Sequence, residues 1–461
     1  MKGSSKWSHR PYKPLMFDTG DIYICRICPG KCMVSFSWLP SDCEDSYTVS
    51  IKPRGSDAEY TTYQTNETSI MVSGLDDCTD YEFFVTAGNK KSRTRLARTG
   101  FVPGDSVVNY LHPEDDVYSY SGRYLCSPSL VRHPDGYLLA SMDVYAGGEP
   151  QDLTLIFRSD DDGITWHYVS ELFPCFWGKM FVHKGSLYML AVNTEYGDLI
   201  IGRSDDGGVT FSSPSVLLRG SNGTHPKGVH KNPQPIIEYN GRLWTTLEWG
   251  SWSSGTHAAM CASISADDDL LVPENWNFTP PVPYDPSWKG TAVGNSPGCI
   301  EGCPVVFPDG MLYNVMRYEI GNCTPSYGLA VVMKTGEPDD ALTFSKVIRF
   351  PGNHSKFMIK QDPVTKKYLS IVSYLSDEHP RRRNHLVLIA SDDCENWVKV
   401  HDLFDCRHLP EAEVGFQYVD YLIEGDDIIF LTRTAFGKAN NFHDANYSVF
   451  TRLADFRKYL I

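Results

Sequence analysis

Apolar and polar residues alternate with a period of two along several short stretches of the chain. The alternation is clear over residues 32–38 and 81–87, and turn-rich sequence lies between them. Successive side chains of a β-strand point to opposite faces, so this period is typical of half-buried strands. No long stretch has the 3.6-residue period of an amphipathic helix. The pattern therefore predicts an all-β protein.

A hairpin-like element recurs after residue 105. Turns containing Asn-Gly, Asp-Gly or Gly-Asp stand next to apolar runs at residues 133–139, 239–244, 308–313 and 424–429. Such dipeptides are strong hairpin signals, and units repeated at tens of residues indicate a propeller or a solenoid. At roughly 45–60 residues per four-stranded blade, the stretch 105–461 predicts about six blades.

A second repeat follows the apolar strands. Ser-Asp-Asp begins the segments 159–166 and 204–211, and a shorter copy lies at 391–397. We expect Asp161 and Asp206 to accept backbone N–H bonds in a turn and the glycines at 163 and 208 to adopt a positive φ. The segments resemble the Asp boxes of sialidase-type propellers. That resemblance implies structural turns without a catalytic role.

The N-terminal part has a different character. Trp38, Gly74-Leu75 and Tyr81, on their alternating stretches, resemble fibronectin type III domains, in which an early Trp packs in the core and a late Tyr lies at a corner between strands. The predicted organisation is an N-terminal extension (1–21), a fibronectin III-like β-sandwich (22–100) and a six-bladed sialidase-like β-propeller (105–461). We expect no chemistry in the sandwich.

Charge and composition exclude some classes of function. The formal net charge of −15 argues against nucleic acid or an anionic membrane as the main partner, because both require basic patches. No run of 18 apolar residues predicts a membrane span. Residues 1–5 lack an apolar signal-peptide core, so the protein is expected either in the cytoplasm or secreted with a leader removed.

The 13 cysteines show no disulfide framework. Cys25, Cys28 and Cys32 form the one tight group, but a zinc site needs a fourth ligand and normally a second close pair. We therefore expect free thiols and predict no metal and no cofactor, with a zinc site as the minor alternative.

Three later segments resemble the active-site motifs of exo-sialidases, in the same order. The resemblance implies that Glu301 activates the nucleophile, that Arg317 and Arg383 bind the substrate carboxylate, and that Tyr418 is the nucleophile. A neutral Tyr hydroxyl suits a sugar with a carboxylate on its anomeric carbon, because an attacking carboxylate would be repelled. A planar guanidinium can bind that carboxylate through two parallel bonds.

A carboxylic acid must also protonate the leaving oxygen. In sialidases it lies on a loop before the first Asp box, which makes Asp152 the candidate acid and Glu149 the second choice. Cys126 stands where the first conserved Arg of sialidases belongs. Other loops offer side chains that suit sugar hydroxyls, sugar faces or the missing charge. These candidate substrate-binding residues are Lys179, His230, Trp177, Trp249, His443 and Asp444.

Ordinary structural roles compete with each assignment. A strand Tyr is usually core, Arg317 can pair with Glu319, and Arg383 belongs to a basic run of the kind that faces solvent. The leading hypothesis is a retaining exo-glycosidase that releases a terminal acidic sugar, sialic acid or a related ulosonic acid, from a glycan. The alternatives are a propeller glycosidase for a different sugar, favoured by Cys126, and a non-catalytic carbohydrate-binding propeller.

Overall fold

The computed structural model describes residues 7, 19–41, 46–220 and 227–460. In this part of the chain the regular elements are strands and two short 3-10 helices, and no α-helix occurs. The prediction of an all-β protein is therefore confirmed for the described residues. Most of the predicted extension 1–21 lies outside them. No helix among the described residues is long and apolar enough to cross a membrane.

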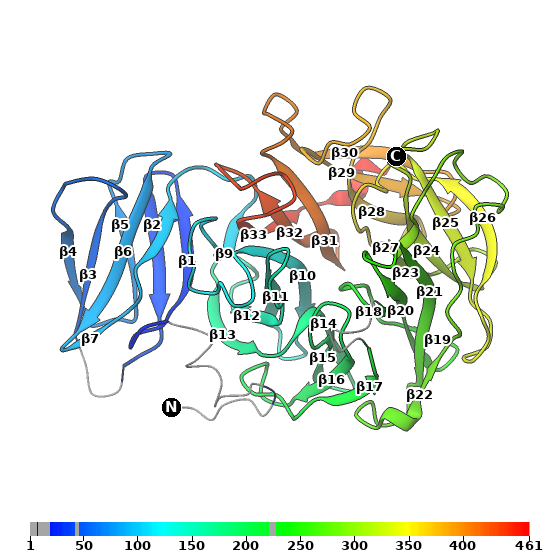
Figure 1. Ribbon diagram of the computed structural model, residues 1–461, viewed down its shortest axis with the longest axis horizontal. Helices are drawn as coiled ribbons and strands as arrows, with labels where there is room; N and C mark the ends of the chain where they lie inside the picture. Colours follow the sequence, from blue (N-terminus) through cyan, green and yellow to red (C-terminus); the bar gives the residue numbers. More distant parts are fainter. Residues whose placement is uncertain (1–6, 8–18, 42–45, 221–226, 461) are drawn as a thin grey trace.

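The N-terminal part folds into two antiparallel sheets that enclose one core (Figure 1). On β2 and β6 every second side chain is buried, as the alternation predicts. The buried set includes Phe36, Trp38 and Phe83. The first sheet contains β1 (Ile24–Gly30), β2 (Met33–Trp38) and β5 (Ser69–Ser73); the second contains β3 (Tyr47–Pro53), β4 (Thr61–Thr65), β6 (Asp80–Ala87), β7 (Lys90–Lys91) and β8 (Arg95–Arg98).

The described residues from 106 onward form six further antiparallel sheets. Within each sheet, strands that follow one another in the chain are mostly neighbours. The first three sheets contain β10 (Tyr124–Arg132), β11 (Leu138–Tyr145), β12 (Leu153–Ser159) and β13 (His167–Leu172); β14 (Phe176–His183), β15 (Ser186–Val192), β16 (Leu199–Ser204) and β17 (Ser215–Leu218); and β18 (Gly228–His230), β19 (Ile237–Tyr239), β20 (Arg242–Ser251), β21 (Thr256–Ser265) and β22 (Trp276–Phe278), the last preceded by η1 (Pro273–Asn275).

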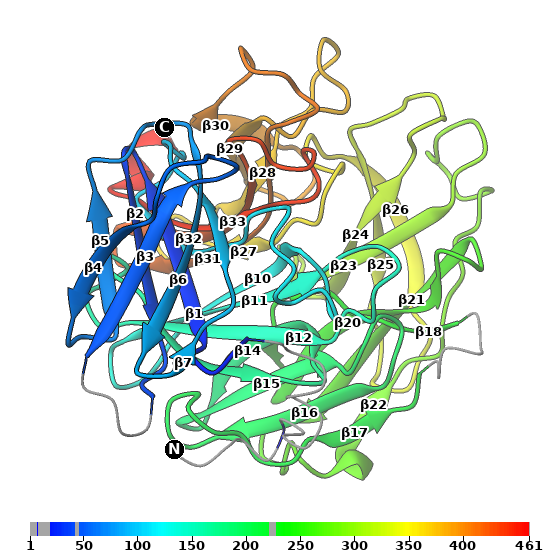
Figure 2. The same cartoon turned by 60° about the vertical axis from the view of Figure 1, so that its left-hand side comes forward.

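The other three sheets repeat this plan. They contain β23 (Gly298–Val306), β24 (Leu312–Glu319), β25 (Leu329–Lys334) and β26 (Thr343–Arg349); β27 (Ile359–Gln361), β28 (Tyr368–Ser373), β29 (His385–Ser391) and β30 (Val398–Asp405); and β31 (Gly415–Glu424), β32 (Asp427–Ala435), β33 (Tyr447–Leu453) and β9 (Ser106–Tyr110), with η2 (Phe456–Tyr459) after β33. The sheets lie side by side around a common centre, a propeller-like arrangement (Figures 1 and 2).

A strand from before the first sheet completes the last one. β9 pairs antiparallel with β33, so the beginning and the end of the ring share one sheet. β10 contacts both the second sheet, through β14, and the last sheet, through β31. We call β10, β14, β18, β23, β27 and β31, the first strand of each sheet, the inner strands. Sequence patterns predict the repeated hairpins but not which distant strand closes the ring.

The turns at residues 159–166 and 204–211 have the same hydrogen bonds. Asp161 Oδ1 accepts from the backbone N–H of Thr165 at 2.8 Å, and Asp206 Oδ1 accepts from that of Thr210 at 2.8 Å. The glycines have φ values of 92° and 84°, at positions 163 and 208. In the shorter copy, Asp393 Oδ1 accepts from two backbone N–H groups, those of Glu395 and Asn396. These carboxylates therefore act as turn acceptors, which was predicted for Asp161 and Asp206.

The sandwich packs directly against the closing sheet. β1 contacts β9, and one apolar cluster includes residues of both, among them Phe36, Val107 and Val449. The Arg26 guanidinium donates to the carbonyl oxygens of Val107 and Val108, at 2.8 Å each. Figures 1 and 2 both show the blue sandwich beside this edge of the ring. The two parts are thus joined by a shared core as well as by the chain.

The tight cysteine group lies on and beside β1. Cys25 is buried, and its thiol donates to the carbonyl oxygen of Ser37 at 3.6 Å. The cysteines of the described part are free thiols. Among those same residues, no three His, Cys, Asp or Glu side chains lie together in a way that could hold a metal ion.

Candidate active site

Four inner strands carry a residue with a left-handed backbone. Each of these residues lies where the register between the inner strand and its neighbour shifts, as in a β-bulge. They are Ser127 (φ 51°), Trp177 (φ 52°), Glu301 (φ 56°) and Tyr418 (φ 56°). A positive φ is strained for a residue other than Gly, and bulges re-aim side chains next to functional sites. We call these four the bulge residues.

Two bulge residues meet at the centre of the candidate site. The Tyr418 hydroxyl donates a hydrogen bond of 2.7 Å to Glu301 Oε1. Arg317, opposite Ile300 on the neighbouring strand β24, donates through Nη1 to Glu301 Oε2 at 2.6 Å. The same Nη1 lies 3.2 Å from the Tyr418 hydroxyl oxygen. The sequence-based prediction had named all three residues, and the structure brings them together.

Burial and neighbouring charges determine the protonation states of Glu301 and Tyr418. Burial would raise the pKa of Glu301, but the neighbouring Arg317 guanidinium lowers it below its usual value, so the carboxylate is ionised near neutral pH. Burial, and then the charge of Glu301, raise the pKa of Tyr418 to about 12. Tyr418 therefore rests as a neutral phenol whose proton already points at an ionised carboxylate.

Three guanidinium groups surround Tyr418. Those of Arg317, Arg383 and Arg433 lie near enough for their charges to lower its pKa against the effect of burial. Arg433 Cζ is 5.0 Å from the centre of the Tyr418 ring. All three side chains are buried, and the Nε–H of each has no hydrogen-bond partner among the described residues. Arg383 belongs to the site and not to solvent, unlike the exposed Arg381 of the same basic run.

Arg433 is the residue that sequence reasoning missed. It lies on β32 opposite Gln417, the residue before the nucleophile candidate. Burial raises the pKa of the Cys126 thiol well above its usual value, and the nearby charge of Arg433 opposes part of that rise. The sequence does offer one signal for Arg433, because it lies in the largely apolar stretch Asp427–Ala435 and buried strands rarely hold an unpaired charge. Arg433 thus places a guanidinium near the Cys126 thiol.

The predicted pair His443 and Asp444 supports Arg433. Arg433 Nη2 donates to the Tyr145 hydroxyl oxygen at 2.6 Å and to the His443 carbonyl oxygen at 2.5 Å. The Tyr145 hydroxyl in turn donates to Asp444 Oδ1 at 2.6 Å. Burial and the Arg433 charge lower the pKa of His443 to about 4, so its ring is neutral near pH 7. Both residues therefore lie at the edge of the site and hold the arginine in place.

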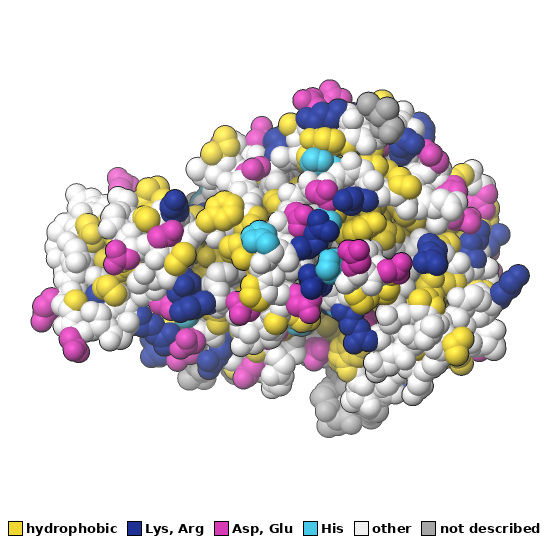
Figure 3. Space-filling view, turned by 90° about the horizontal axis from the view of Figure 1, so that it is seen from above, with side chains coloured by type: hydrophobic (Ala, Val, Ile, Leu, Met, Phe, Trp, Pro, Cys, Tyr) yellow, Lys and Arg dark blue, Asp and Glu magenta, His cyan; other side chains and the backbone are white. Residues whose placement is uncertain are grey.

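Aromatic and histidine rings pack together near Glu301. The Trp177 and His230 ring centres are 4.4 Å apart, and His230 Nδ1 lies 2.6 Å from Glu248 Oε2. Glu248 Oε1 accepts from the backbone N–H of Gly302, directly beside Glu301. Trp249 is half-buried and packs instead against the apolar cluster of the second and third sheets. Basic, acidic and histidine side chains gather near the middle of the face that Figure 3 shows.

The candidate acids differ in burial. Asp152 is buried, and burial raises its pKa to about 7. Its Oδ1 has no hydrogen-bond partner among the described residues. The neighbouring Gln151 donates through Nε2 to Glu195 Oε2 at 3.1 Å, and burial also raises the pKa of Glu195. Glu149 is exposed. Asp152 can therefore carry a proton on part of the molecules near neutral pH, and burial shifts the pKa of Glu195 in the same direction.

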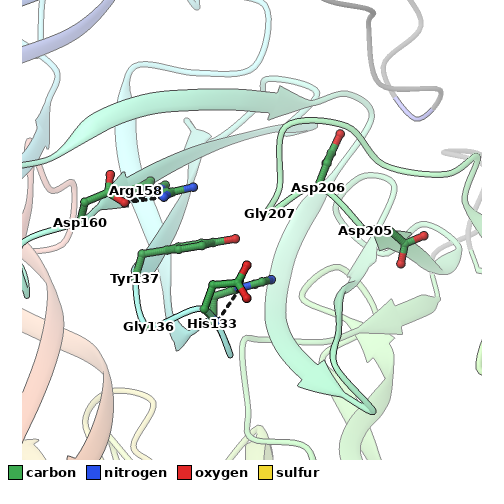
Figure 4. A pocket seen from close by; sticks show the side chains of 9 residues that line it. His133, Gly136, Tyr137, Arg158, Asp160, Asp205, Asp206 and Gly207 are labelled. Atoms are coloured by element: carbon green, nitrogen blue, oxygen red, sulfur yellow. Dashed lines mark hydrogen bonds and ion pairs between the residues drawn. The ribbon is translucent and has the colours of Figure 1, made fainter.

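Lys179 forms its ion pair outside the group of Glu301, Arg317 and Tyr418. Its ammonium group donates to Asp420 on β31, near the axis of the ring. A separate surface pocket of about 560 Å³ lies between the turns of the first two sheets and is lined by residues such as Tyr137, Arg158 and Asp206 (Figure 4). There Arg158 pairs with Asp160, and Asp206 serves as a turn acceptor. That pocket has a structural explanation, and we assign it no chemistry.

Comparisons with known proteins identify the fold. No protein-family model matches the sequence, and no curated protein matches it. The structure of an α-L-arabinanase from Penicillium chrysogenum, complexed with arabinobiose, superposes with a TM-score of 0.51 at 15% identity, over 76% of this chain and 98% of that one. A leech intramolecular trans-sialidase, complexed with 2,7-anhydro-Neu5Ac, gives 0.50 at 10% identity, over 99% and 97%. These likenesses show a propeller-like fold.

Proposed function

We propose that this protein is a retaining exo-glycosidase that releases a terminal acidic sugar, sialic acid or a related ulosonic acid. The observation that carries the proposal is the 2.7 Å hydrogen bond from the Tyr418 hydroxyl to Glu301, surrounded by three buried guanidinium groups. A tyrosine nucleophile with a carboxylate base is the arrangement that suits a sugar whose anomeric carbon already bears a carboxylate.

The proposed domains follow the fold. Residues 105–461 would be a six-bladed propeller whose blades are the six sheets, and residues 22–100 a fibronectin type III-like domain. In support of the latter, the Tyr81 hydroxyl accepts from the backbone N–H of Asp76 at 2.9 Å, five residues upstream, as in the tyrosine corner of such sandwiches. Residues 1–21 would be an extension.

The first chemical step would form a bond between the Tyr418 oxygen and the anomeric carbon. Glu301 accepts the phenolic proton as the bond forms, and the glycosidic bond breaks. The leaving oxygen takes a proton from Asp152, whose pKa of about 7 keeps part of it protonated near neutral pH. In the second step Asp152 takes a proton from water, water attacks the anomeric carbon, and Tyr418 regains its proton from Glu301. Two inversions give net retention.

Arg317, Arg383 and Arg433 would bind the substrate carboxylate. Each is a buried guanidinium beside Tyr418, and its positive charge would favour a bound carboxylate. Arg433 would supply the contact for which sialidases use an arginine at the position of Cys126. His443, Asp444 and Tyr145 would orient Arg433, while Trp177 and His230 would contact the sugar.

A neutral sugar is the second candidate substrate. Cys126 departs from the sialidase pattern, and the fold is shared with an arabinanase as well as with a trans-sialidase. A propeller that only binds carbohydrate is the third candidate, and the close contact between Tyr418 and Glu301 favours catalysis over it.

The test is hydrolysis of aryl glycosides by wild type, Tyr418→Phe and the matched control Tyr239→Phe, whose hydroxyl bonds to the carbonyl oxygen of Gly310 on the surface. The panel contains a sialoside, a second ulosonoside and an arabinofuranoside. We expect release from an acidic glycoside by wild type and the control but not by Tyr418→Phe. Release from the arabinofuranoside alone would replace the substrate assignment, and cleavage by Tyr418→Phe at the wild-type rate would overturn the nucleophile.

A further inference from the structure

Four lysines lie on or next to three of the inner strands. Lys179 is on β14, Lys231 follows β18, Lys356 precedes β27 and Lys360 is on β27. Lys231 is 0% and Lys356 1% exposed, Lys179 is buried, and Lys360 is half-buried. Lysine is one of the residues least often fully buried unless paired, so this group needs a physical explanation.

The four ammonium groups have little negative charge around them. Within the described residues, Asp420 is the only carboxylate that forms an ion pair with any of them, and it pairs with Lys179. The others donate to carbonyl oxygens: Lys231 to that of Asn232 at 3.1 Å, Lys356 to that of Val419 at 3.4 Å and Lys360 to that of Tyr421 at 2.5 Å. Each ammonium has three N–H donors and bonds to one acceptor residue in the described part of the chain, which leaves donors for a ligand.

A second carboxyl group, that of Asp143 near Lys231, does not balance this charge. Asp143 is buried, accepts from the Thr154 hydroxyl and the Trp177 backbone N–H, and has its pKa raised to about 7 by burial. Glu301 is engaged by Arg317. Burial and the charges of neighbouring lysines lower the pKa of Lys231 to about 7. A buried cation without a charged partner is destabilising, so an anion among the lysines would be stabilising.

A cavity of about 740 Å³ reaches two of the four lysines. It is lined by Lys179 and Lys360 and by the later residues of the inner strands, namely Leu130–Arg132, Met180–Val182, Pro304–Val306 and Leu422–Glu424. Glu301 and Tyr418 come earlier on their strands than the lining residues. Because the inner strands run in the same direction around the axis, the cavity opens at the end of the ring opposite the candidate active site.

We propose that the lysines Lys179, Lys231, Lys356 and Lys360 form a binding site for a small tetrahedral oxyanion, of the phosphate or sulfate type. Its four oxygens can accept bonds from ammonium groups that approach from several inner strands, and its charge offsets the excess of buried cations. It enters through the 740 Å³ cavity. The site shares no residue with the glycosidase machinery and does not depend on that proposal.

The test is calorimetric titration of sulfate and of inorganic phosphate into the full chain, with chloride holding the ionic strength constant. Wild type should bind one oxyanion per chain with a saturable isotherm. Lys360→Gln, which removes a half-buried donor from the cavity wall, should weaken binding at least tenfold. Lys184→Gln, an exposed lysine paired with Asp267, is the matched control and should bind as wild type does.

Thermal unfolding gives a second measurement. Sulfate also stabilises proteins generally, by exclusion from their surfaces, so the informative quantity is the difference between variants. The sulfate-dependent rise in Tm should be larger for wild type and Lys184→Gln than for Lys360→Gln and Lys231→Met. Equal rises in all four proteins, or no saturable heat in wild type, would overturn the site. Tyr418→Phe should bind the oxyanion normally, which separates this site from the proposed active site.

Discussion

Tyr418 and Glu301 are 117 residues apart in the chain, yet a 2.7 Å hydrogen bond joins them. Each occupies the left-handed position of a register shift on its inner strand. The strain of two such backbones is of the order of 1–3 kcal/mol each and persists only when the surrounding sheets impose it. The rigid ring therefore supplies the positioning that a phenol and its base require.

Replacing the base tests this relationship directly. Glu301→Gln keeps the shape of the side chain but cannot take the phenolic proton, so kcat/KM for an acidic aryl glycoside should fall by roughly 10²–10⁴-fold. The variant also leaves Arg317 without its 2.6 Å carboxylate partner. Circular dichroism and thermal unfolding should show that the protein still folds. A loss of less than about threefold in a folded variant would contradict the role of Glu301.

The acid is tested by the pH dependence of the rate. The pKa of Asp152 is raised to about 7, so its protonated form is lost as the pH rises through 7, and activity should fall on that alkaline side. Asp152→Asn should abolish this alkaline limb of the pH–rate profile. It should also lower the rate of cleavage far more for substrates with poor leaving groups than for activated aryl glycosides. Glu195→Gln is the comparison. If the limb disappears in Glu195→Gln and persists in Asp152→Asn, Glu195 is the acid.

Arg433 should determine selectivity for acidic substrates. Arg433→Met removes a charge-assisted contact worth about 1.5–3 kcal/mol, so kcat/KM for the acidic glycoside should fall roughly 10–150-fold, mainly through KM. Activity on any neutral glycoside in the panel should change much less. Arg382→Met, beside the site but paired with Glu411, is the control. An equal loss on acidic and neutral substrates would mean that Arg433 acts only on structure.

The turn carboxylates should contribute to stability alone. Asp161 accepts bonds from the Ser159 and Thr165 hydroxyls and from the Thr165 backbone N–H, at 2.6–2.8 Å. Asp161→Ala should lower the free energy of unfolding by about 1–3 kcal/mol, because it leaves turn donors unpaired. The exposed Asp268→Ala should have almost no effect. Activity per folded molecule should match wild type at low temperature, and a specific loss there would contradict a purely structural role.

A buried ion pair connects the sandwich to the loop before β10. Arg95 Nε donates to Asp115 Oδ2 at 2.6 Å, with both side chains almost fully buried. Asp115→Ala should reduce the free energy of unfolding by about 3–5 kcal/mol, since it leaves the Arg95 charge uncompensated. Denaturant unfolding measures the change. The double variant Arg95→Met, Asp115→Leu should be more stable than Asp115→Ala, and the opposite order would show that charge burial is not the cause.

Local sequence signals located the strands and turns well. Residues 81–87 lie within β6, and the predicted strand 32–38 differs from β2 only at Cys32, a turn residue with φ 54°. The pairing of β9 with β33 was not predictable, because alternation gives the face of a strand and not its distant partner. Tertiary contacts decide that pairing.

The candidate site was predicted in part. Glu301, Arg317, Arg383 and Tyr418 come together as the sialidase resemblance implied, and their chemical roles stay predictions. The left-handed backbones at Glu301 and Tyr418 gave no sequence signal, since neither residue is Gly. Lys179 was assigned to the substrate because a loop lysine offers charge, but its partner Asp420 lies on a distant strand. Arg433 was missed because its position beside Tyr418 depends on the register of β32.

The pairing of β9 with β33 has a consequence during synthesis on the ribosome. The backbone of Arg452 bonds to Asp105, 347 residues earlier, so the ring cannot close until nearly the whole chain has been made. At 5–20 residues per second, β9 waits roughly 20–70 s for its partner. A bare strand edge would invite aggregation in that interval. The sandwich precedes the ring in the chain, and its Arg26 binds the carbonyl oxygens of Val107 and Val108, so β9 can pack on the sandwich before β33 has been made.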